Sequence, residues 1–218
     1  MASITSEKIT LGTSSDPVRL GFLELITPSA FGDDPNATKK FQGSAILDPS
    51  NAKHMEQAKF LQDQAADILR RGSVSKEELL SVCFGKDKKN RAGKVYEGFE
   101  GKIFVTATQD EENRHNILIG NRQGQEVMPT EKGAPYSGAY GIMKVTLWLQ
   151  NNKWGKRINA NLLVVQMIKD GPAFGAQRLN ADEEFERLPV ENGGSNSFIG
   201  DGQQANGGGV KESSSGWL

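Results

Sequence analysis

Residues 139–150 alternate between apolar and polar side chains, and this alternation limits the fold more than any other feature of the sequence. One set of positions is apolar throughout, namely Met143, Val145, Leu147 and Leu149. The positions between them carry Tyr140, Ile142, Lys144, Thr146 and Trp148. Successive side chains of a β-strand point to opposite faces, so the pattern predicts a long strand whose first set lies in the core. Asn151-Asn152 then predicts a turn into a second strand over 154–168, which makes the pair a hairpin.

Shorter segments with strand-like composition precede this hairpin. They cover 18–26, ended by Thr27-Pro28, then 40–48, 99–109 and 117–119. A helix of about 20 residues is predicted between Asp48 and Gly72, because apolar side chains recur there every three or four positions. A capping box at Ser75 predicts a second, short helix that closes at Gly85. Together these elements predict a mainly β fold with inserted helices, an α+β arrangement built around a small antiparallel barrel.

Charge and glycine are distributed unevenly along the chain. The formal net charge is only −1, but residues 132–169 carry six basic side chains and no acid, and 86–94 are also basic. Residues 182–218 contain seven acidic and two basic side chains. The last 29 residues are rich in Gly, Ser, Asn and Gln, and such a composition cannot bury enough apolar surface to offset the entropy of ordering. We therefore expect a flexible N-terminal segment over 1–16, one folded domain over 17–180, and an acidic, then Gly/Ser-rich flexible tail over 181–218.

Motifs for catalysis are missing from the sequence. Neither a G-x-x-x-x-G-K-[ST] loop nor a G-x-G-x-x-G motif occurs, and the single Cys83 excludes a disulfide framework and a cysteine-based zinc site. His54, expected on the helix surface, and His115 are far apart. Asp110-Glu111-Glu112 is an acidic run, but adjacent loop residues rarely converge on one ion. We therefore expect no catalytic residue, no cofactor and no metal. The polar N-terminus and the absence of a long apolar run predict a protein of the cytoplasm.

Aromatic and basic side chains are interleaved around the alternating strand. Tyr136, Tyr140, Trp148 and Trp154 fall within a stretch that contains lysines and no acidic residue. Single-stranded DNA needs flat side chains for its bases, at on the order of 1–3 kcal/mol per stacked base. It also needs cations for the phosphates, and these contacts weaken with salt. The pattern therefore favours binding to single-stranded DNA, although the same rings could instead cover one edge of the core while Lys144 keeps the outer face hydrated.

Several short motifs occur in the order and spacing of a known family. They are Val18-Arg19-Leu20 with Pro28-x-x-Phe31, the strand 40–47 before a long helix, Tyr96-Glu97-Gly98-Phe99-Glu100-Gly101, Tyr136-Ser137-Gly138-Ala139-Tyr140, Asp170-Gly171-Pro172-Ala173-Phe174-Gly175 and Asp182-Glu183-Glu184-Phe185. Over roughly residues 17–187 the chain resembles the bacteriophage single-stranded-DNA-binding proteins with an OB fold, long catalogued as phage proteins of unknown function. The resemblance implies a five-stranded OB-fold barrel with Greek-key connections. It also implies coating of single strands during phage DNA replication, recombination and repair in the cytoplasm of the bacterial host.

The end of the chain departs from this resemblance. Proteins of this function usually finish with a strongly acidic tip and a final aromatic residue, whereas here residues 213–218 keep an aromatic, Trp217, but are nearly uncharged. We expect Trp217 and Leu218 to bind replication proteins of the phage or host. The missing acidic tip is an argument against this expectation. The acidic tail is also expected to compete with DNA for a groove lined by Lys144, Lys153, Lys156 and Arg157.

The predicted binding site combines the aromatic and basic side chains of these segments. It comprises Tyr136, Tyr140, Lys144, Trp148, Lys153, Trp154, Lys156, Arg157, Lys88, Lys89, Arg91, Lys94, Tyr96, Phe104 and Arg122. Single-stranded DNA is the expected partner, bound without sequence preference by a monomer or a dimer. The alternative is a virion or assembly protein that uses a β-rich module and a flexible arm for contacts with other subunits.

Overall fold

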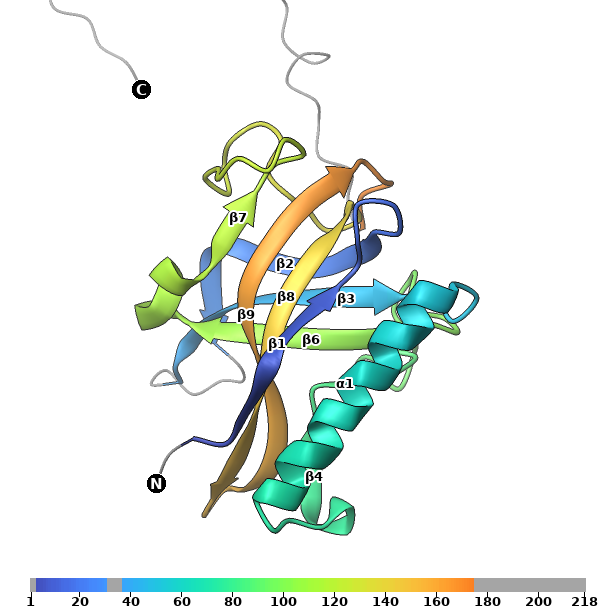
Figure 1. Ribbon diagram of the computed structural model, residues 1–218. Coiled ribbons are helices and arrows are strands. Elements are labelled where there is room, and N and C mark those ends of the chain that lie inside the picture. Colours follow the sequence, from blue (N-terminus) through green and yellow to red (C-terminus); the bar gives the residue numbers. More distant parts are fainter. Residues whose placement is uncertain (1–2, 31–36, 175–218) are drawn as a thin grey trace, which may run out of the picture. The chain divides into compact units, whose positions relative to one another are not determined.

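The computed structural model describes residues 3–30 and 37–174 (Figure 1). Contacts group Met1–Arg178 into one compact unit and Leu179–Leu218 into another. The expected tail over 181–218, with Trp217 and Leu218, lies outside the described residues, as does Phe31. All described residues belong to the first unit.

Strands dominate the described part of the chain, which confirms the mainly β class with few helices. The elements in chain order are β1 (Thr5–Leu11), β2 (Val18–Ala30), β3 (Lys39–Leu47), α1 (Ala52–Arg71), the 3-10 helix η1 (Lys76–Glu78), β4 (Leu79–Val82), β5 (Phe84–Lys86), β6 (Ile103–Asp110), the 3-10 helix η2 (Glu111–Asn116), β7 (Leu118–Gly120), β8 (Tyr140–Asn152) and β9 (Gly155–Lys169). The long β8–β9 hairpin extends well beyond β2, β3 and β6 (Figure 1). The far part of this hairpin therefore carries its side chains beyond these three strands.

Five strands are paired in a cycle. β2 pairs with β3, β3 with β6, and β8 with β9, each antiparallel. Two short contacts complete the cycle, one between β2 and β8 and one between β6 and β9 at Thr108 and Asn161. The β6–β9 contact is parallel, as are the contacts of β4 and β7 with β9, so the expectation of a purely antiparallel sheet is wrong. The reason is chain direction, because β9 leaves the tight β8–β9 turn running the same way as β4, β6 and β7.

The alternation of β8 has the predicted structural meaning. Met143, Val145 and Leu147 are fully buried and Leu149 is 9% exposed. They join the inward side chains of β1, β2, β3, β6 and β9 in one hydrophobic core. The other face of β8 is partly exposed along its whole length up to Gln150. The core assignment of β8 is therefore confirmed.

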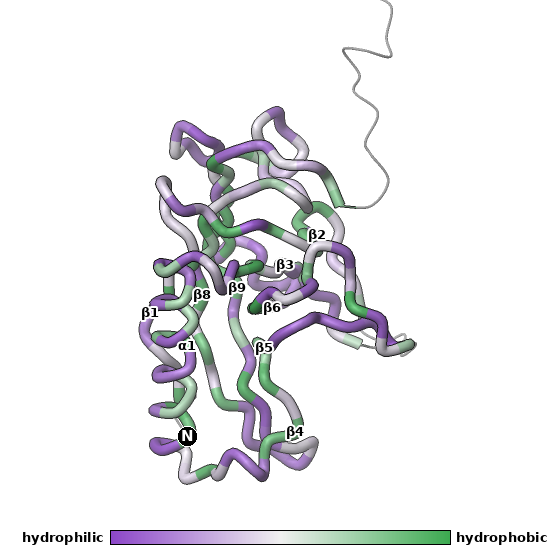
Figure 2. Tube along the Cα trace, turned by 90° about the vertical axis from the view of Figure 1, so that its right-hand side faces the viewer, coloured by the Kyte–Doolittle hydropathy of each residue, from purple (hydrophilic) through white to green (hydrophobic). Residues whose placement is uncertain are grey.

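Helix α1 closes the core on the side of β1 and β8 (Figures 1 and 2). It begins after Asn51, whose side chain accepts hydrogen bonds from the backbone N–H groups of Lys53 and His54, so the helix expected between Asp48 and Gly72 is confirmed. Gly72 ends it where a Cβ would lie 2.2 Å from Leu149 Cδ2, so a larger residue there would require the Leu149 side chain to move.

Three boundaries differ from the sequence-based expectations. The segment 1–16 was expected to be flexible, but it contains β1, which pairs with β8 and buries Ile9 and Leu11 completely. The predicted short helix stops after one 3-10 turn, because residues 79–82 pair with β9 and the Cys83 N–H donates to Ile158 O. β2 continues past Pro28 to Ala30, and its pairing with β3 is irregular there, which tolerates the missing proline N–H.

Candidate nucleic-acid interface

The outer face of β1, β8 and β9 is polar and basic. Cross-strand partners share a face of a sheet: Lys8 lies opposite Thr146, Thr146 opposite Asn161, Thr10 opposite Lys144, Trp148 opposite Asn159, and Gln150 opposite Arg157. We name these nine residues the outer platform. None of them is acidic, and Glu7 lies in the irregular stretch of β1 between the paired positions Thr5 and Lys8. The platform therefore offers one tryptophan, three cations and a row of amides and hydroxyls.

The cations of the outer platform keep their charge available. Within residues 3–30 and 37–174, no carboxylate forms an ion pair with Lys8, Lys144 or Arg157. The opposite face of the same strands is occupied by the core and by α1. A ligand can therefore reach the platform only from the side that carries these cations, and an anionic chain is the ligand they suit.

The tip of the β8–β9 hairpin extends the platform with the most exposed aromatic ring of the described chain. Trp154 is 68% exposed, and Lys153 Nζ lies 5.0 Å from its ring centroid. Arg157 donates from Nη1 to the Trp154 carbonyl at 2.9 Å, which joins the tip to the platform. Lys156 instead pairs with Glu78, and its hydrogen bond lowers the pKa of that carboxyl. Lys156 is thus a weaker candidate for a phosphate contact than Lys153.

Tyr140, at the start of β8, lies far from Trp148 on the same strand face. Eight residues of extended chain separate them, which is about 26 Å. The Tyr140 ring has two cations near it, with Arg19 Cζ at 5.8 Å and Lys169 Nζ at 5.5 Å from its centroid. Tyr136 has a different role, because its hydroxyl donates to Gly171 O at 2.8 Å and accepts from Gly171 N at 3.1 Å. It fixes the chain that leaves β9.

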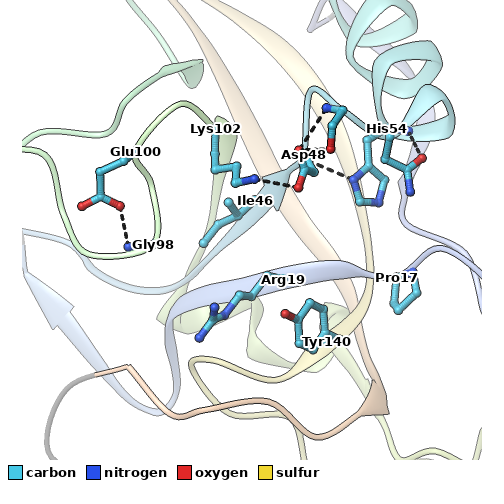
Figure 3. Close-up of a pocket in the computed structure, with 11 residues that line it drawn as sticks. Pro17, Arg19, Ile46, Asp48, His54, Gly98, Glu100, Lys102 and Tyr140 are labelled. Atoms are coloured by element: carbon cyan, nitrogen blue, oxygen red, sulfur yellow. Dashed lines mark hydrogen bonds and ion pairs between the residues drawn. The ribbon is translucent and has the colours of Figure 1, made fainter.

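A pocket of about 580 Å³ opens beside Tyr140 (Figure 3). Arg19 and Tyr140 lie on one side, and Asp48, His54 and Lys102 lie across from them. The ion pair with Lys102 at 2.6 Å and two bonds from Ser50 hold the pKa of Asp48 well below its usual range. His54 was expected on the surface, but it is 5% exposed, since Asp48 N donates to its Nδ1 at 3.0 Å and draws the ring inward.

Five aromatic rings pack on the outer face of β2, β3 and β6. Phe22, Tyr96, Phe99, Phe104 and Phe174 form a chain of ring contacts with centroids 4.8–6.5 Å apart. We name them the ring cluster. The segment between β5 and β6 supplies two of these rings and covers the sheet so closely that Ser44 and Ile46 are buried. Phe22 adopts a positive φ of 50°, which is strained for an aromatic residue.

Lys88 enters this cluster and does not extend into solvent. Its Nζ donates to Ser44 Oγ at 3.1 Å and to Thr106 Oγ1 at 2.7 Å. The same nitrogen lies 4.7 Å from the Phe22 ring and 5.5 Å from the Phe104 ring. Burial lowers the pKa of Lys88 from its ordinary value of 10.5 to about 8. Lys88, Tyr96 and Phe104 are thus partly buried in or beside the ring cluster, and their contact with DNA stays a prediction.

The remaining predicted cations are exposed. Lys89, Arg91 and Lys94 lie on the turn that joins the bridged positions Lys89 and Val95. Arg122 is half exposed and forms an ion pair with Asp170 at 2.6 Å. Neither group is on the outer platform, whose strands are β1, β8 and β9. The structure therefore brings together Lys144, Trp148, Lys153, Trp154 and Arg157, and leaves the others on separate surfaces.

Two features of the described residues concern metal binding and thiol chemistry. No group of three or more His, Cys, Asp or Glu side chains is placed to hold a metal among residues 3–30 and 37–174. Burial raises the pKa of the Cys83 thiol to about 12, so its nucleophilic thiolate is suppressed. None of the helices described has the length and apolar character of a membrane span.

Comparison with known proteins identifies the family of this chain. The family model described as "Enterobacter phage Enc34, ssDNA-binding protein" matches residues 8–195, which is most of the chain. This chain belongs to that family. One relative is protein p50 of Acyrthosiphon pisum secondary endosymbiont phage 1, which is 26% identical to this chain over 177 residues. The aligned region covers 79% of this chain and 91% of p50.

Two solved structures similar in fold to this chain are of the bacteriophage Enc34 protein. The single-stranded DNA-binding protein of bacteriophage Enc34 in complex with single-stranded DNA has a TM-score of 0.61 at 23% identity, covering 77% of this chain and 89% of that one. A second structure of the Enc34 protein has a TM-score of 0.58 at 20% identity, covering 84% and 98%. The predicted family is therefore confirmed, and the structures support the same fold.

The sequence-based site prediction for this Enc34-family chain omits several residues that lie near predicted aromatic residues. The sequence assigns Lys8 to a flexible segment and Arg19 only to a motif, but Lys8 is on the platform with Trp148 and Arg19 lies at the Tyr140 ring. Phe22 and Phe174 were not linked to Tyr96 and Phe104, because nothing local signals contacts across such distances in sequence. Plain alternation places Phe22 on the face of the buried Val18 and Leu20, and the register shift between Gly21 and Glu24 that turns it outward leaves no signal in the sequence.

Replacement of Lys88 by methionine should leave the fold intact. The free energy of unfolding at pH 7 is expected to change by less than about 1 kcal/mol or to rise, because an apolar side chain of similar length removes a buried charge. The hydroxyls of Ser44 and Thr106 stay paired with each other at 2.9 Å. Urea denaturation measures the change, with Lys89→Met as the control at an exposed neighbour.

The pH dependence of that experiment has a defined sign. The folded-state pKa of Lys88 lies below the unfolded value, so between the two the unfolded chain binds more protons and stability rises with pH. The wild type should therefore gain stability relative to Lys88→Met as pH rises from about 8 towards 10. A loss of more than about 2 kcal/mol at pH 7 in the variant would instead mean that the ring and hydroxyl contacts outweigh desolvation.

Proposed function

We propose that this protein coats single-stranded DNA without sequence preference, with the outer platform and the hairpin tip as the contact surface. The observation that carries the proposal is the acid-free outer platform, where Lys8, Lys144 and Arg157 share one sheet face with Trp148. Stacking of bases on Trp148 and on the exposed Trp154 is tolerant of sequence, since every base has a flat face. Cations between the rings suit the phosphates. Membership in a family of single-stranded-DNA-binding phage proteins supports the same conclusion.

We further propose that the five cyclically paired strands are an OB-fold. An OB-fold is a five-stranded, partly open Greek-key barrel that binds oligonucleotides on one face and with its loops. The order β2-β3-β6-β9-β8 and the thin contacts at β2–β8 and β6–β9 support this assignment. In this reading the β8–β9 tip, with Lys153 and Trp154, is one of the loops that hold the strand.

The biological setting is part of the proposal. Coating and protection of single strands suits phage DNA replication, recombination and repair in the cytoplasm of the bacterial host. The other predicted contacts remain proposals, namely Lys89, Arg91, Lys94, Arg122, Lys156 and Lys88 for phosphates and Tyr96, Phe104 and Tyr136 for bases. The tail residues Trp217 and Leu218 remain the proposed contact for phage or host replication proteins.

Titration of the full-length protein with oligo-dT tests the proposal. Intrinsic tryptophan fluorescence should be quenched, because stacked bases quench the indoles of Trp148 and Trp154, and added salt should reverse the quenching. Duplex DNA of the same length is the control and should quench less. An unchanged spectrum together with concentration-dependent self-association would favour the alternative, a virion or assembly protein.

A further inference from the structure

Beyond the platform, the pocket beside Tyr140 has the construction of a ligand site. Its two sides come from different parts of the chain, with Arg19 and Tyr140 at the β2–β8 contact and Asp48, His54 and Lys102 around the start of α1 (Figure 3). The volume of about 580 Å³ is enough for a nucleotide and falls in the range of small-molecule sites.

One side of this pocket is already fixed by its own hydrogen bonds. Asp48 accepts from Ser50 N at 3.0 Å and from Ser50 Oγ at 2.8 Å, besides its ion pair with Lys102. His54 bonds to Asp48 N through Nδ1 and faces Asp16 O with Nε2 at 3.3 Å. These groups form a preorganised polar wall that needs no ligand to hold its shape.

The other side is not satisfied in the same way. Arg19 Nη2 donates to Pro172 O at 2.9 Å, and the guanidinium lies 4.2 Å from the Phe174 ring centroid. Its Nε is buried, and the described residues supply no hydrogen-bond acceptor for it. This Nε is closed to solvent, so it is the rest of the guanidinium, with no carboxylate paired to it among the described residues, that a phosphate can meet. Beside it, Tyr140 offers a partly exposed ring.

We propose that this pocket is a nucleotide subsite that takes one unit of the bound strand, with its base on Tyr140 and its phosphate at Arg19. An arginine beside an aromatic ring meets both needs of a nucleotide, because the guanidinium binds phosphate oxygens and the ring stacks the base. Tyr140 and Trp148 share one face of β8, so a strand along the outer platform reaches the pocket at its end. The subsite rests on the proposed function and extends its contact surface.

Photocrosslinking of the full-length protein to oligonucleotides that carry 5-iododeoxyuridine tests the subsite. Such a base crosslinks to the aromatic side chain on which it stacks, and mass spectrometry of the peptides identifies that residue. The expected crosslinks are to Tyr140 and to Trp148, with the first lost in Tyr140→Leu and kept in Tyr140→Phe. Tyr140→Leu should also lower the affinity for oligo-dT about tenfold, since one stack is lost, while Tyr140→Phe binds like the wild type.

The two proposals fail in different ways. Crosslinks at Trp148 or Trp154 with none at Tyr140, or equal affinities for Tyr140→Leu and wild type, would overturn the subsite and leave the platform in place. No binding of any single strand would overturn both. Because Tyr140→Leu could disturb the β2–β8 contact, its melting temperature is compared with that of Tyr140→Phe, and the crosslink in the wild type stands independently of that variant.

Discussion

Trp148→Ala is expected to weaken binding to oligo-dT about tenfold, because one stacked base contributes on the order of 1–3 kcal/mol. Trp148 is the only aromatic ring of the outer platform, and it has no hydrogen-bonding role among the described residues that alanine would abolish. Its flanking positions, Thr5 and Asn159, carry no ring that could replace it. Fluorescence anisotropy of labelled oligo-dT measures the change without depending on the signal of the deleted indole.

Two further variants make the Trp148 experiment specific. Trp148→Phe keeps a ring on which a base can stack, so it should recover most of the affinity. If the smaller size of the side chain, and not the loss of stacking, weakened binding, both variants would bind less tightly. The control is Phe60→Ala, which removes a ring of α1 that is 41% exposed. Because α1 covers the core side of β8, this variant should bind like the wild type. Binding by Trp148→Ala at wild-type strength, with an unchanged fold, would remove the platform from the proposal.

The sequence was sufficient where structure depends on neighbours along the chain. The alternation in β8 identified its core face correctly, since the period of two is a property of any strand and needs no knowledge of its partners. The helix between Asp48 and Gly72 was predictable for the same reason, from its period and its caps. The family was recognisable because its motifs are also local runs.

What the sequence could not provide depends on contacts between distant segments. The basic run 86–94 gave no sign that Lys88 turns inward, because its partners Ser44 and Thr106 are 44 and 18 residues away. Residues 79–82 have the composition of a helix, but pairing with β9 makes them a strand. Likewise, Arg19 joins Tyr140 only through the β2–β8 contact. Each miss is a case in which tertiary pairing overrides a local preference.

The strongest effect is expected from removal of the platform charges. Replacing Lys8, Lys144 and Arg157 together by glutamine should lower the slope of log affinity against log salt by about 2, at roughly 0.7 per lost phosphate contact with a single strand. The affinity at 50 mM salt should fall about a hundredfold, and the difference from wild type should shrink as salt is raised, since counterion release supplies this part of the binding free energy.

Glutamine removes the charge but keeps a polar side chain, and none of the three has an ion pair in the described chain whose loss would destabilise the fold. The control carries the same change of net charge on α1, with Lys53, Lys59 and Arg70 replaced by glutamine. If overall charge alone attracted the DNA, both triple variants would lose affinity and slope equally. A loss confined to the platform variant supports phosphate contacts on β1, β8 and β9, because the cations deleted there share a sheet face with Trp148, whereas those of the control lie on α1.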